Sequence, residues 1–542
     1  MHLFEENLCT LSEECAYYPL TDFTYASSAL GIKDQQGDRI PRGSVMSIGP
    51  GGGIDALMAI RYGAERFDGA EVNPSVIDFV RDFRRTNGFI YERPQIHVTA
   101  IDGRSFVREA KAKHKHYSLL YSALTKSATV SQGTILVESY IYTEDAFLDY
   151  WDILDSDGQL AILTDNPDLL ARLFATAVSC LSKRGMNSTE AGNHIVLLHV
   201  PEDATGPYRY AIWVRKKPIT NSQAEQIWRD ASARRFTLMW SPGLSEHLEM
   251  GPYAYVGQGS MSLDQFIDWW HDPANVHQLG KNEPLNVRPC DDNRPFFLDL
   301  SLNGEPMYIN LSLTIAVLVF LLTIVKWMRI DVGPATRAIH MSRARVSFPC
   351  FCLFTAYFAA LGIGFMEIEM PLAQRLILPL GYPALAMAVV LFSMMLGSGL
   401  GALFSQRIPD LKLKQWTIVC MLSVAFLAIS ILCLLTKLQD VLFLASIPMR
   451  CIIVSIVLLI LGFFLGIPLP GGIRLFAKIH ARSIPLLWGV NGLTSVVGSL
   501  SAVSIARDWG FNVVLVVGSM VYISSALLLA TATSTRVNAS SV

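Results

Sequence analysis

The sequence predicts two unlike halves, an α/β domain with a mostly parallel sheet and an all-α membrane domain with several spans. From residue 44, apolar runs of strand length alternate with amphipathic stretches of helix length, as in βαβ units. Beyond Pro306, apolar stretches recur with lengths near the ~20 residues that cross a bilayer. Of the 542 residues, 51% are hydrophobic and 17% are charged, against about 25% charged in a typical soluble domain. This composition excludes an ordinary soluble enzyme and a disordered chain.

These patterns divide the chain into four regions. They are an N-terminal segment (1–43), the α/β domain (44–218), an irregular connecting region rich in Trp, Pro and Asp (219–305), and the helical membrane domain (306–542). The net charge of −2 provides no basic field, so we expect no nucleic-acid partner. No two of the nine cysteines have CxxC spacing, so we expect neither a metal site nor a disulfide framework.

Seven strands are predicted in the α/β domain. They cover 44–48, 66–72, 97–101, 117–124, 159–164, 194–200 and 210–214, with helices over 54–62 and 168–181 among the connections. The last two strands follow each other without a helix, so we expect an antiparallel hairpin at one edge of the sheet.

The first strand runs into a glycine-rich turn, Gly49-Pro50-Gly51-Gly52-Gly53, that opens a helix. In such a turn the backbone N–H groups and the helix dipole face a ligand, and glycine lets the ligand approach closely. We therefore expect Gly49, Gly51 and Gly53 to line a binding site. The alternative is a turn that only connects two elements.

Two acids support the binding interpretation. Glu71 ends the second strand 18 residues after Gly53, close to the ~20 expected for a carboxylate that binds ribose hydroxyls. Asp102 ends the third strand, where its carboxylate can accept a bond from an adenine amine while Gly103 lets the base lie close. The alternative for Asp102 is a helix cap ahead of Ser105. Together, the loop and the two acids occupy successive strand C-termini, which predicts a Rossmann-like nucleotide site.

Three segments resemble motifs of the S-adenosylmethionine-binding fold, and more narrowly of the spermidine synthase-like branch of class I methyltransferases. They are Ser47–Asp55, Gly69–Pro74 and Ile101–Phe106. The resemblance implies S-adenosylmethionine as the donor, with the three loop glycines near its methionine part, Glu71 at the ribose and Asp102 at the adenine. Gly362–Glu369, Gln374-Arg375, Leu391–Gly401 and Trp488–Gly492 resemble the membrane region of that family's membrane-fused members.

The position at the end of the fourth strand departs from this family. Polyamine synthases carry acids there, because aminopropyl transfer needs a base, whereas residues 117–125 contain no Asp or Glu. Tyr121 and Ser122 either contact substrate or pack within the strand. Tyr140 and Tyr142 either border the pocket or only precede a helix that Thr143 caps. We therefore assign no catalytic residue.

The segment Cys290–Phe297 resembles the stretch that precedes the membrane part in the membrane-fused relatives. Its Asp291-Asp292 pair either closes over the pocket, anchors the domain at the bilayer, or forms an Asx-type turn.

Seven membrane spans are predicted, at 308–325, 346–366, 384–404, 416–435, 451–469, 485–505 and 511–531. The glycine pairs Gly397/Gly401 and Gly462/Gly466 predict close helix packing.

Five polar residues stand out in this half of the chain. Glu367 and Glu369 either face the bundle interior, with Arg375 as partner, or lie at the interface. Asn491 lies within an apolar run, and Arg474 follows a broken helix that can line a cavity. A lipid-like substrate entering from the bilayer is the hypothesis that these residues suggest.

The basic loops conflict with the expected location of the cofactor. With seven spans, most Lys and Arg lie in loops on the side opposite the α/β domain, which by the positive-inside rule places that domain outside. However, the acidic N-terminus does not resemble a signal peptide, and S-adenosylmethionine is cytosolic. We therefore expect a multi-pass protein of the inner or plasma membrane with the α/β domain in the cytoplasm, and either segment 308–325 does not cross or the count is off by one.

Three functions follow. The first is a membrane-embedded S-adenosylmethionine-dependent transferase that methylates a small-molecule or lipid acceptor, since methyl transfer tolerates a site without a strong base. The second is an aminopropyltransferase of the spermidine synthase type. The third is a transporter or sensor that binds the nucleotide without chemistry. The sequence predicts no oligomeric state.

Overall fold

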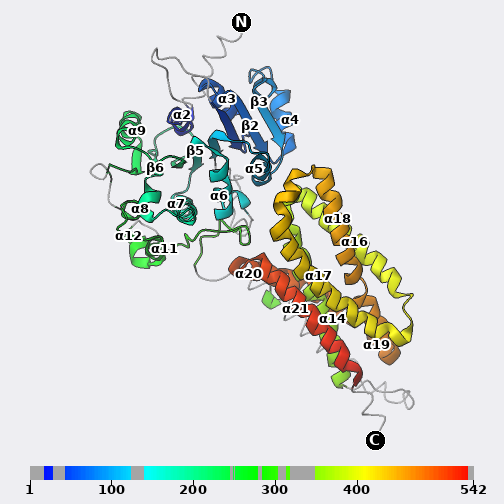
Figure 1. The fold of residues 1–542 in the computed structure, drawn as a ribbon. Helices are drawn as coiled ribbons and strands as arrows, with labels where there is room; N and C mark the ends of the chain where they lie inside the picture. Colours follow the sequence, from blue (N-terminus) through cyan, green and yellow to red (C-terminus); the bar gives the residue numbers. More distant parts are fainter. Residues whose placement is uncertain are drawn as a thin grey trace. The chain divides into compact units, whose positions relative to one another are not determined.

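The computed structural model describes residues 17–28, 43–123, 139–244, 248, 251–278, 283–302, 313–315, 317 and 348–534. The chain forms two compact units, Met1–Asn303 and Gly304–Val542. Each unit is described by itself (Figure 1).

The N-terminal unit contains an eight-stranded sheet in the order β3-β2-β1-β4-β5-β7-β6-β8. The strands are β1 (Ser44–Ile48), β2 (Arg66–Glu71), β3 (Ile96–Ala100), β4 (Tyr117–Ala123), β5 (Leu154–Thr164), β6 (Ile195–His199), β7 (Tyr210–Arg215) and β8 (Thr237–Trp240). Strands β1 to β5 pair in parallel, and β7, β6 and β8 pair antiparallel. The Rossmann-like α/β fold expected from the sequence is therefore confirmed.

Helices cover both faces of the sheet (Figure 1). They are α2 (Pro19–Ala26), α3 (Ile54–Arg61), α4 (Pro74–Asp82), α5 (Gly103–Ala112), α6 (Glu144–Ile153), α7 (Pro167–Lys183) and α8 (Ser188–Gly192), with short 3₁₀ turns η2 (Ile90–Glu92) and η4 (Tyr140–Tyr142). Side-chain oxygens of Asn73, Asp102, Thr143 and Asn166 cap the first turns of α4, α5, α6 and α7. Such caps satisfy N–H groups that would otherwise lack partners, so the helices begin directly where the strands end.

The connecting region 219–305 is not irregular, contrary to our expectation. It contains α9 (Asn221–Ala233), β8, α10 (Pro252–Gly257), α11 (Leu263–His271) and α12 (Pro273–Gln278). Capping boxes at Thr220/Gln223 and Ser262/Gln265 start two of these helices. Because β8 adds to β6, the β6–β7 hairpin lies inside the edge of the sheet, which corrects its expected position.

The C-terminal unit is helical, and six helices of the described chain are long and apolar enough to cross a membrane. The helices are α14 (Phe348–Arg375), α15 (Ile377–Leu380), α16 (Pro383–Ser405), α17 (Asp410–Leu444), α18 (Ile447–Leu465), α19 (Pro468–His480), η7 (Ala481–Ser483), α20 (Ile484–Trp509) and α21 (Phe511–Ser534). The first expected span, 308–325, lies almost entirely outside the described residues. The other six expected spans correspond to helices of this unit.

Glycines set the contact between α16 and α18. An added Cβ at Gly397 would lie 2.4 Å from the Leu459 carbonyl oxygen, and one at Gly466 would lie 2.0 Å from that of Ser398. Only glycine permits this approach of two backbones, so the packing interpretation of these glycines is confirmed. On the other side of the bundle, α14, α20 and α21 run side by side (Figure 1).

Candidate active site

The glycine-rich turn lies at the C-terminal end of β1, where the strand order reverses between β1 and β4. Gly49, Gly51 and Gly53 have φ angles of 74°, 50° and 93°, a region that L side chains rarely adopt. The Tyr91 hydroxyl donates to the Gly51 carbonyl oxygen at 2.7 Å and fixes the turn. No atom outside the turn lies within 4 Å of a Cβ built at Gly52, so the loop keeps an open side. The crevice at such a reversal is where open α/β sheets bind ligands.

Glu71 ends β2 and faces this loop. Its Oε2 accepts a bond from the Gly51 N–H at 3.3 Å, and its Oε1 accepts one from the Asn73 N–H at 3.0 Å. A carboxylate has about four lone-pair sites, so both oxygens keep capacity for a ligand hydroxyl. The structure thus brings Glu71 and the glycine loop into contact across 20 residues of sequence.

Asp102 caps α5, and it lies after the C-terminal end of β3, at the same edge of the sheet as the glycine loop and Glu71. Its Oδ1 accepts bonds from the Ser105 N–H at 3.0 Å and the Ser105 hydroxyl at 3.2 Å. The Arg104 N–H also bonds to this carboxyl group. A carboxylate has about four lone-pair sites, so it keeps capacity for a ligand. Burial raises the pKa of this carboxyl, although the bonds from Ser105 oppose the shift. A Cβ on Gly103 would lie 2.5 Å from Ile48 Cγ2, so Gly103 lets α5 start against β1.

Tyr121 and Ser122 point to opposite faces of β4, as successive strand residues do. The Tyr121 hydroxyl lies 2.9 Å from Thr21 Oγ1 and its ring 5.3 Å from that of Tyr25, so Tyr121 packs against α2. Ser122 lies on the other face, with its hydroxyl 3.4 Å from that of Tyr142. The structure therefore brings Ser122 and Tyr142 together and separates Tyr121 from them.

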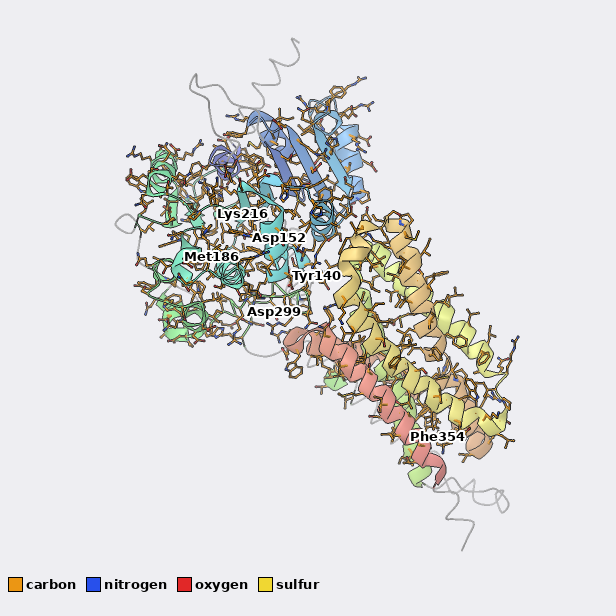
Figure 2. All side chains as sticks on the ribbon, viewed as in Figure 1. Tyr140, Asp152, Met186, Lys216, Asp299 and Phe354 are labelled. Atoms are coloured by element: carbon orange, nitrogen blue, oxygen red, sulfur yellow. The ribbon has the colours of Figure 1, made fainter. Side chains whose placement is uncertain are left out.

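The η4 turn with Tyr140 and Tyr142 is held by the 290–297 segment. The Ser139 N–H donates to the Pro295 carbonyl oxygen at 2.7 Å, and the ring of Tyr142 lies 4.9 Å from that of Phe297. Figure 2 shows Tyr140 at the start of α6 and Asp299 on the stretch of chain that follows this segment. Both tyrosines are buried.

Asp291 and Asp292 have separate roles. Asp291 accepts bonds from the N–H groups of Asn293 and Arg294, which is the Asx-type turn. Asp292 accepts a bond from the Thr143 hydroxyl at 2.6 Å and pairs with the fully buried Arg104 at 3.2 Å. The 290–297 segment thus connects Thr143, the cap of α6, to Arg104 on α5, two residues after Asp102.

A network of opposite charges surrounds Arg104. Asp149 on α6 pairs with Arg104, with Arg108 at 2.7 Å and with Lys111 at 2.6 Å. Burial alone would raise the pKa of Asp149, but these cations hold it below its ordinary value. The network fixes α5, which Asp102 caps, against α6, which Tyr142 precedes.

Sequence reasoning missed Asp55, a buried acid on the first turn of α3. The Ser47 hydroxyl donates to its Oδ2 at 2.5 Å, and burial raises its pKa from 3.8 to about 7. Because Ser47 pairs with Tyr121 in the sheet, Asp55 lies on the face of Tyr121 rather than that of Ser122. Its position two residues after the glycine loop was the available signal.

The antiparallel hairpin that the sequence predicts is formed by β6 and β7. The N-terminal unit has a Rossmann-like α/β fold, in which five parallel strands are followed by antiparallel strands. No family model matches the chain, and no curated protein matches it.

Among solved structures, spermidine synthase from Thermotoga maritima is 15% identical, with 41% of this chain and 70% of that chain covered and a TM-score of 0.27. A probable spermidine synthase from Corynebacterium glutamicum is 14% identical, with 39% and 70% covered and a TM-score of 0.28. Human methyltransferase-like protein 13, solved in complex with SAH, is 13% identical, with 41% and 90% covered and a TM-score of 0.28.

In the C-terminal unit, Glu367 and Glu369 lie within α14 and are buried among the helices. The expected ion pair with Arg375 is not formed: among the described residues, Glu367 contacts Ser501 instead. Arg375 lies two turns further along α14, too far along the axis for a direct pair.

Arg474 and Asn491 bond to backbone carbonyls. Arg474 donates to the carbonyl oxygens of Ser405 and Ile408 and pairs with Asp410 at 2.7 Å, so it joins the end of α16 to the start of α17. Asn491 donates to the Phe358 carbonyl oxygen at 3.0 Å. Within the described chain, no three His, Cys, Asp or Glu side chains gather in a way that could hold a metal ion.

Proposed function

We propose that this chain is a membrane-anchored S-adenosylmethionine-dependent methyltransferase. The observation that carries the proposal is the alignment of the glycine loop, Glu71 and Asp102 at the C-terminal ends of the adjacent strands β1, β2 and β3. Ligands of open α/β sheets bind at this edge, beside the reversal of strand order.

The residues fit the donor by their chemistry. The open side of the loop at Gly52 accommodates the methionine part, the free lone pairs of Glu71 suit ribose hydroxyls, and the carboxylate of Asp102 suits an exocyclic amine. The donor supplies an activated methyl group on a sulfonium. The protein then has to hold the acceptor in line with that group, which is a task of positioning.

Methyl transfer is favoured over aminopropyl transfer by the location of the acids. The acceptor side of the site presents Ser122 and Tyr142, and β4 carries no carboxylate. Asp55, the acid whose pKa is raised to about 7, lies on the opposite face of the sheet. A general base must be within hydrogen-bond reach of the proton it removes, so Asp55 does not serve an amine at Ser122.

The acceptor in this proposal is a lipid or another small molecule of the membrane, with the N-terminal unit in the cytoplasm. The six apolar helices of the second unit support a bilayer location. S-adenosylmethionine is a cytosolic compound, which supports the cytoplasmic side.

One assay tests the reaction: the purified full chain, labelled S-adenosylmethionine and a membrane extract. The expected product is S-adenosylhomocysteine together with a labelled acceptor in the lipid fraction. Methylthioadenosine would replace the proposal by aminopropyl transfer. Binding of the donor without either product would indicate a non-catalytic sensor or transporter.

Two variants test the site by calorimetric measurement of donor affinity. Glu71→Gln removes a charge while keeping the size, and Asp102→Ser keeps a good helix cap but removes the oxygen assigned to the base. Each is expected to weaken binding by about 10- to 100-fold, the loss of one bond to a charged group. Asp78→Asn, on the exposed side of α4, is the matched control. Unchanged affinity in both site variants would refute the proposed pocket.

A further inference from the structure

Glu367 occupies the contact of three membrane helices. It is 3% exposed on α14, and its Oε1 lies 3.3 Å from the Ser501 hydroxyl on α20. A Cβ built on Gly518 of α21 would lie 3.0 Å from Glu367 Cβ, so the backbone of α21 closes the third side. The second carboxyl oxygen, Oε2, is buried without a hydrogen-bond partner among the described residues.

This contact is deep in the helices. Glu367 and Ser501 each precede the end of their helix by eight residues, and Gly518 follows the start of α21 by seven. At 1.5 Å per residue the contact lies roughly 10–12 Å from these ends. The hydrocarbon core of a bilayer is about 30 Å thick. If the helix ends lie at its surface, the contact lies inside the core and away from water.

The hydrogen bonds of Ser501 indicate whether the Glu367 carboxyl group carries a proton. The Ser501 hydroxyl has one proton but two acceptors in reach, the Gly498 carbonyl oxygen at 3.0 Å and Glu367 Oε1 at 3.3 Å. The shorter bond is the ordinary one from a helical serine to a carbonyl one turn back. If Ser501 donates there, the contact with Glu367 is a hydrogen bond only when the carboxyl group provides the proton.

No cation neutralises Glu367 in the described part of the chain. On α14 the other charged residues are Glu369 and Arg375, and α15 and α16 contain none. On α20, Arg507 lies 3.9 Å from Asp508, and on α21 Tyr522 packs beside Gly364. On α19, Arg474 and Lys478 both pair with Asp410.

We propose that Glu367 is a proton-binding site of the membrane unit, a neutral acid that donates its proton to Ser501 Oγ. A carboxylate here would be an unpaired charge in apolar surroundings. The neutral acid carries no charge and donates through Oε1 to Ser501, so only the carbonyl oxygen Oε2 keeps no partner among the described residues. Release of the proton then requires water or a cation to enter between α14, α20 and α21. The inference is independent of the methyltransferase proposal, because it concerns only the C-terminal unit.

Infrared spectroscopy of the full chain in liposomes at pH 7 tests this. The difference between wild type and Glu367→Gln is expected to contain the carbonyl band of a protonated carboxylic acid. Ser501→Ala is expected to shift that band to higher frequency, because the acid loses its acceptor. Glu369→Gln, on the same helix, is the matched control and is expected to leave the band unchanged.

Two outcomes would overturn the proposal. One is a difference spectrum with carboxylate bands and no acid band, since Glu367 would then be ionised. The other is a Ser501→Ala band at the wild-type frequency, since the acid would then not donate to that serine. If Glu367→Gln does not fold, mass spectrometry of wild type and Ser501→Ala treated with dicyclohexylcarbodiimide, which attacks protonated carboxyls, replaces it. Modification at Glu367 is then expected, and its absence contradicts the inference.

Discussion

Asp55 has a carboxyl group whose pKa lies near neutral pH. Burial raises the pKa of its carboxyl from 3.8 to about 7, so between these values the folded chain binds a proton that the unfolded chain has lost. Stability therefore falls as pH rises through this window, by up to about 4 kcal/mol for a shift of roughly three units. We expect Asp55→Asn to flatten this slope in denaturation of the full chain followed at several pH values. The exposed Asp157→Asn serves as control, and an unchanged slope in Asp55→Asn would contradict the assignment.

Gly103 sets the distance between Asp102 and β1. An alanine Cβ at 103 would lie 2.5 Å from Ile48 Cγ2, so α5 has to shift. We expect Gly103→Ala to cost about 1–3 kcal/mol of stability, as overpacking does, and to weaken donor binding through Asp102. Thermal unfolding and donor titration measure the two effects. Gly52→Ala, with no foreign atom within 4 Å of its Cβ, is expected to leave the melting temperature nearly unchanged. Equal stability of the two variants would contradict the packing role of Gly103.

Site residues with a local signal were predictable from the sequence. The loop glycines and the acids at strand ends follow from spacing, because a strand, a turn and a helix place them regardless of the rest of the chain. Asp292 is different, since its partner Arg104 is 188 residues away and no local pattern connects them. Asp55 was visible in the sequence, but its burial depends on α2, α3 and β4 meeting around it.

At the scale of elements, Arg172 on α7 holds the end of the N-terminal unit. Its buried guanidinium donates to the carbonyl oxygens of Asn286, Phe296 and Phe297, and burial lowers its pKa. Arg172→Met would remove the Arg172 bonds from the carbonyl oxygens of Asn286 and Phe297, each costing about 1–3 kcal/mol if it stays buried without a donor. The Phe296 carbonyl oxygen would keep its bond from the Asp299 N–H. We expect the 283–302 segment to detach and to become the first site of cleavage in limited proteolysis. Arg229→Met on exposed α9 is the control, and an unchanged cleavage pattern in Arg172→Met would contradict this role.

Elements were predictable where periodicity and caps agreed. Five parallel strands and six apolar helices follow from apolar runs of the right length. The helices of 219–305 were missed because Trp and Pro obscure their short amphipathic patterns, although the capping boxes at Thr220 and Ser262 were readable. Strand β8 has four residues, and its pairing with β6 is a tertiary property.

At the scale of the whole molecule, the directions of the helices show which charged loops lie on the same side of the membrane. Contacts of Gly362 with Asn491 and of Glu367 with Ser501 show that α14 and α20 run in the same direction. In an alternating path through six helices, the start of α14, the α16–α17 loop and the stretch before α20 then share one side. The α16–α17 loop and the stretch before α20 are basic, with Arg407, Lys412 and Arg482 among their residues. Arg450, on the other side, is buried and bonded to three backbone carbonyls, so it is not a free surface charge.

If the six described helices are all the spans and segment 308–325 does not cross, the two ends of the chain lie on the same side of the membrane. The N-terminal unit then lies on the side of the basic loops, so the positive-inside rule and the cytosolic donor agree. We expect tags at Met1 and Val542 both to be protected from external protease in sealed cells and cleaved after permeabilisation. A seventh span would place the two tags on opposite sides, so cleavage of one tag alone would exclude this topology. External cleavage of both tags would retain six spans but move the N-terminal unit away from the cytosolic donor, and with it the proposed reaction.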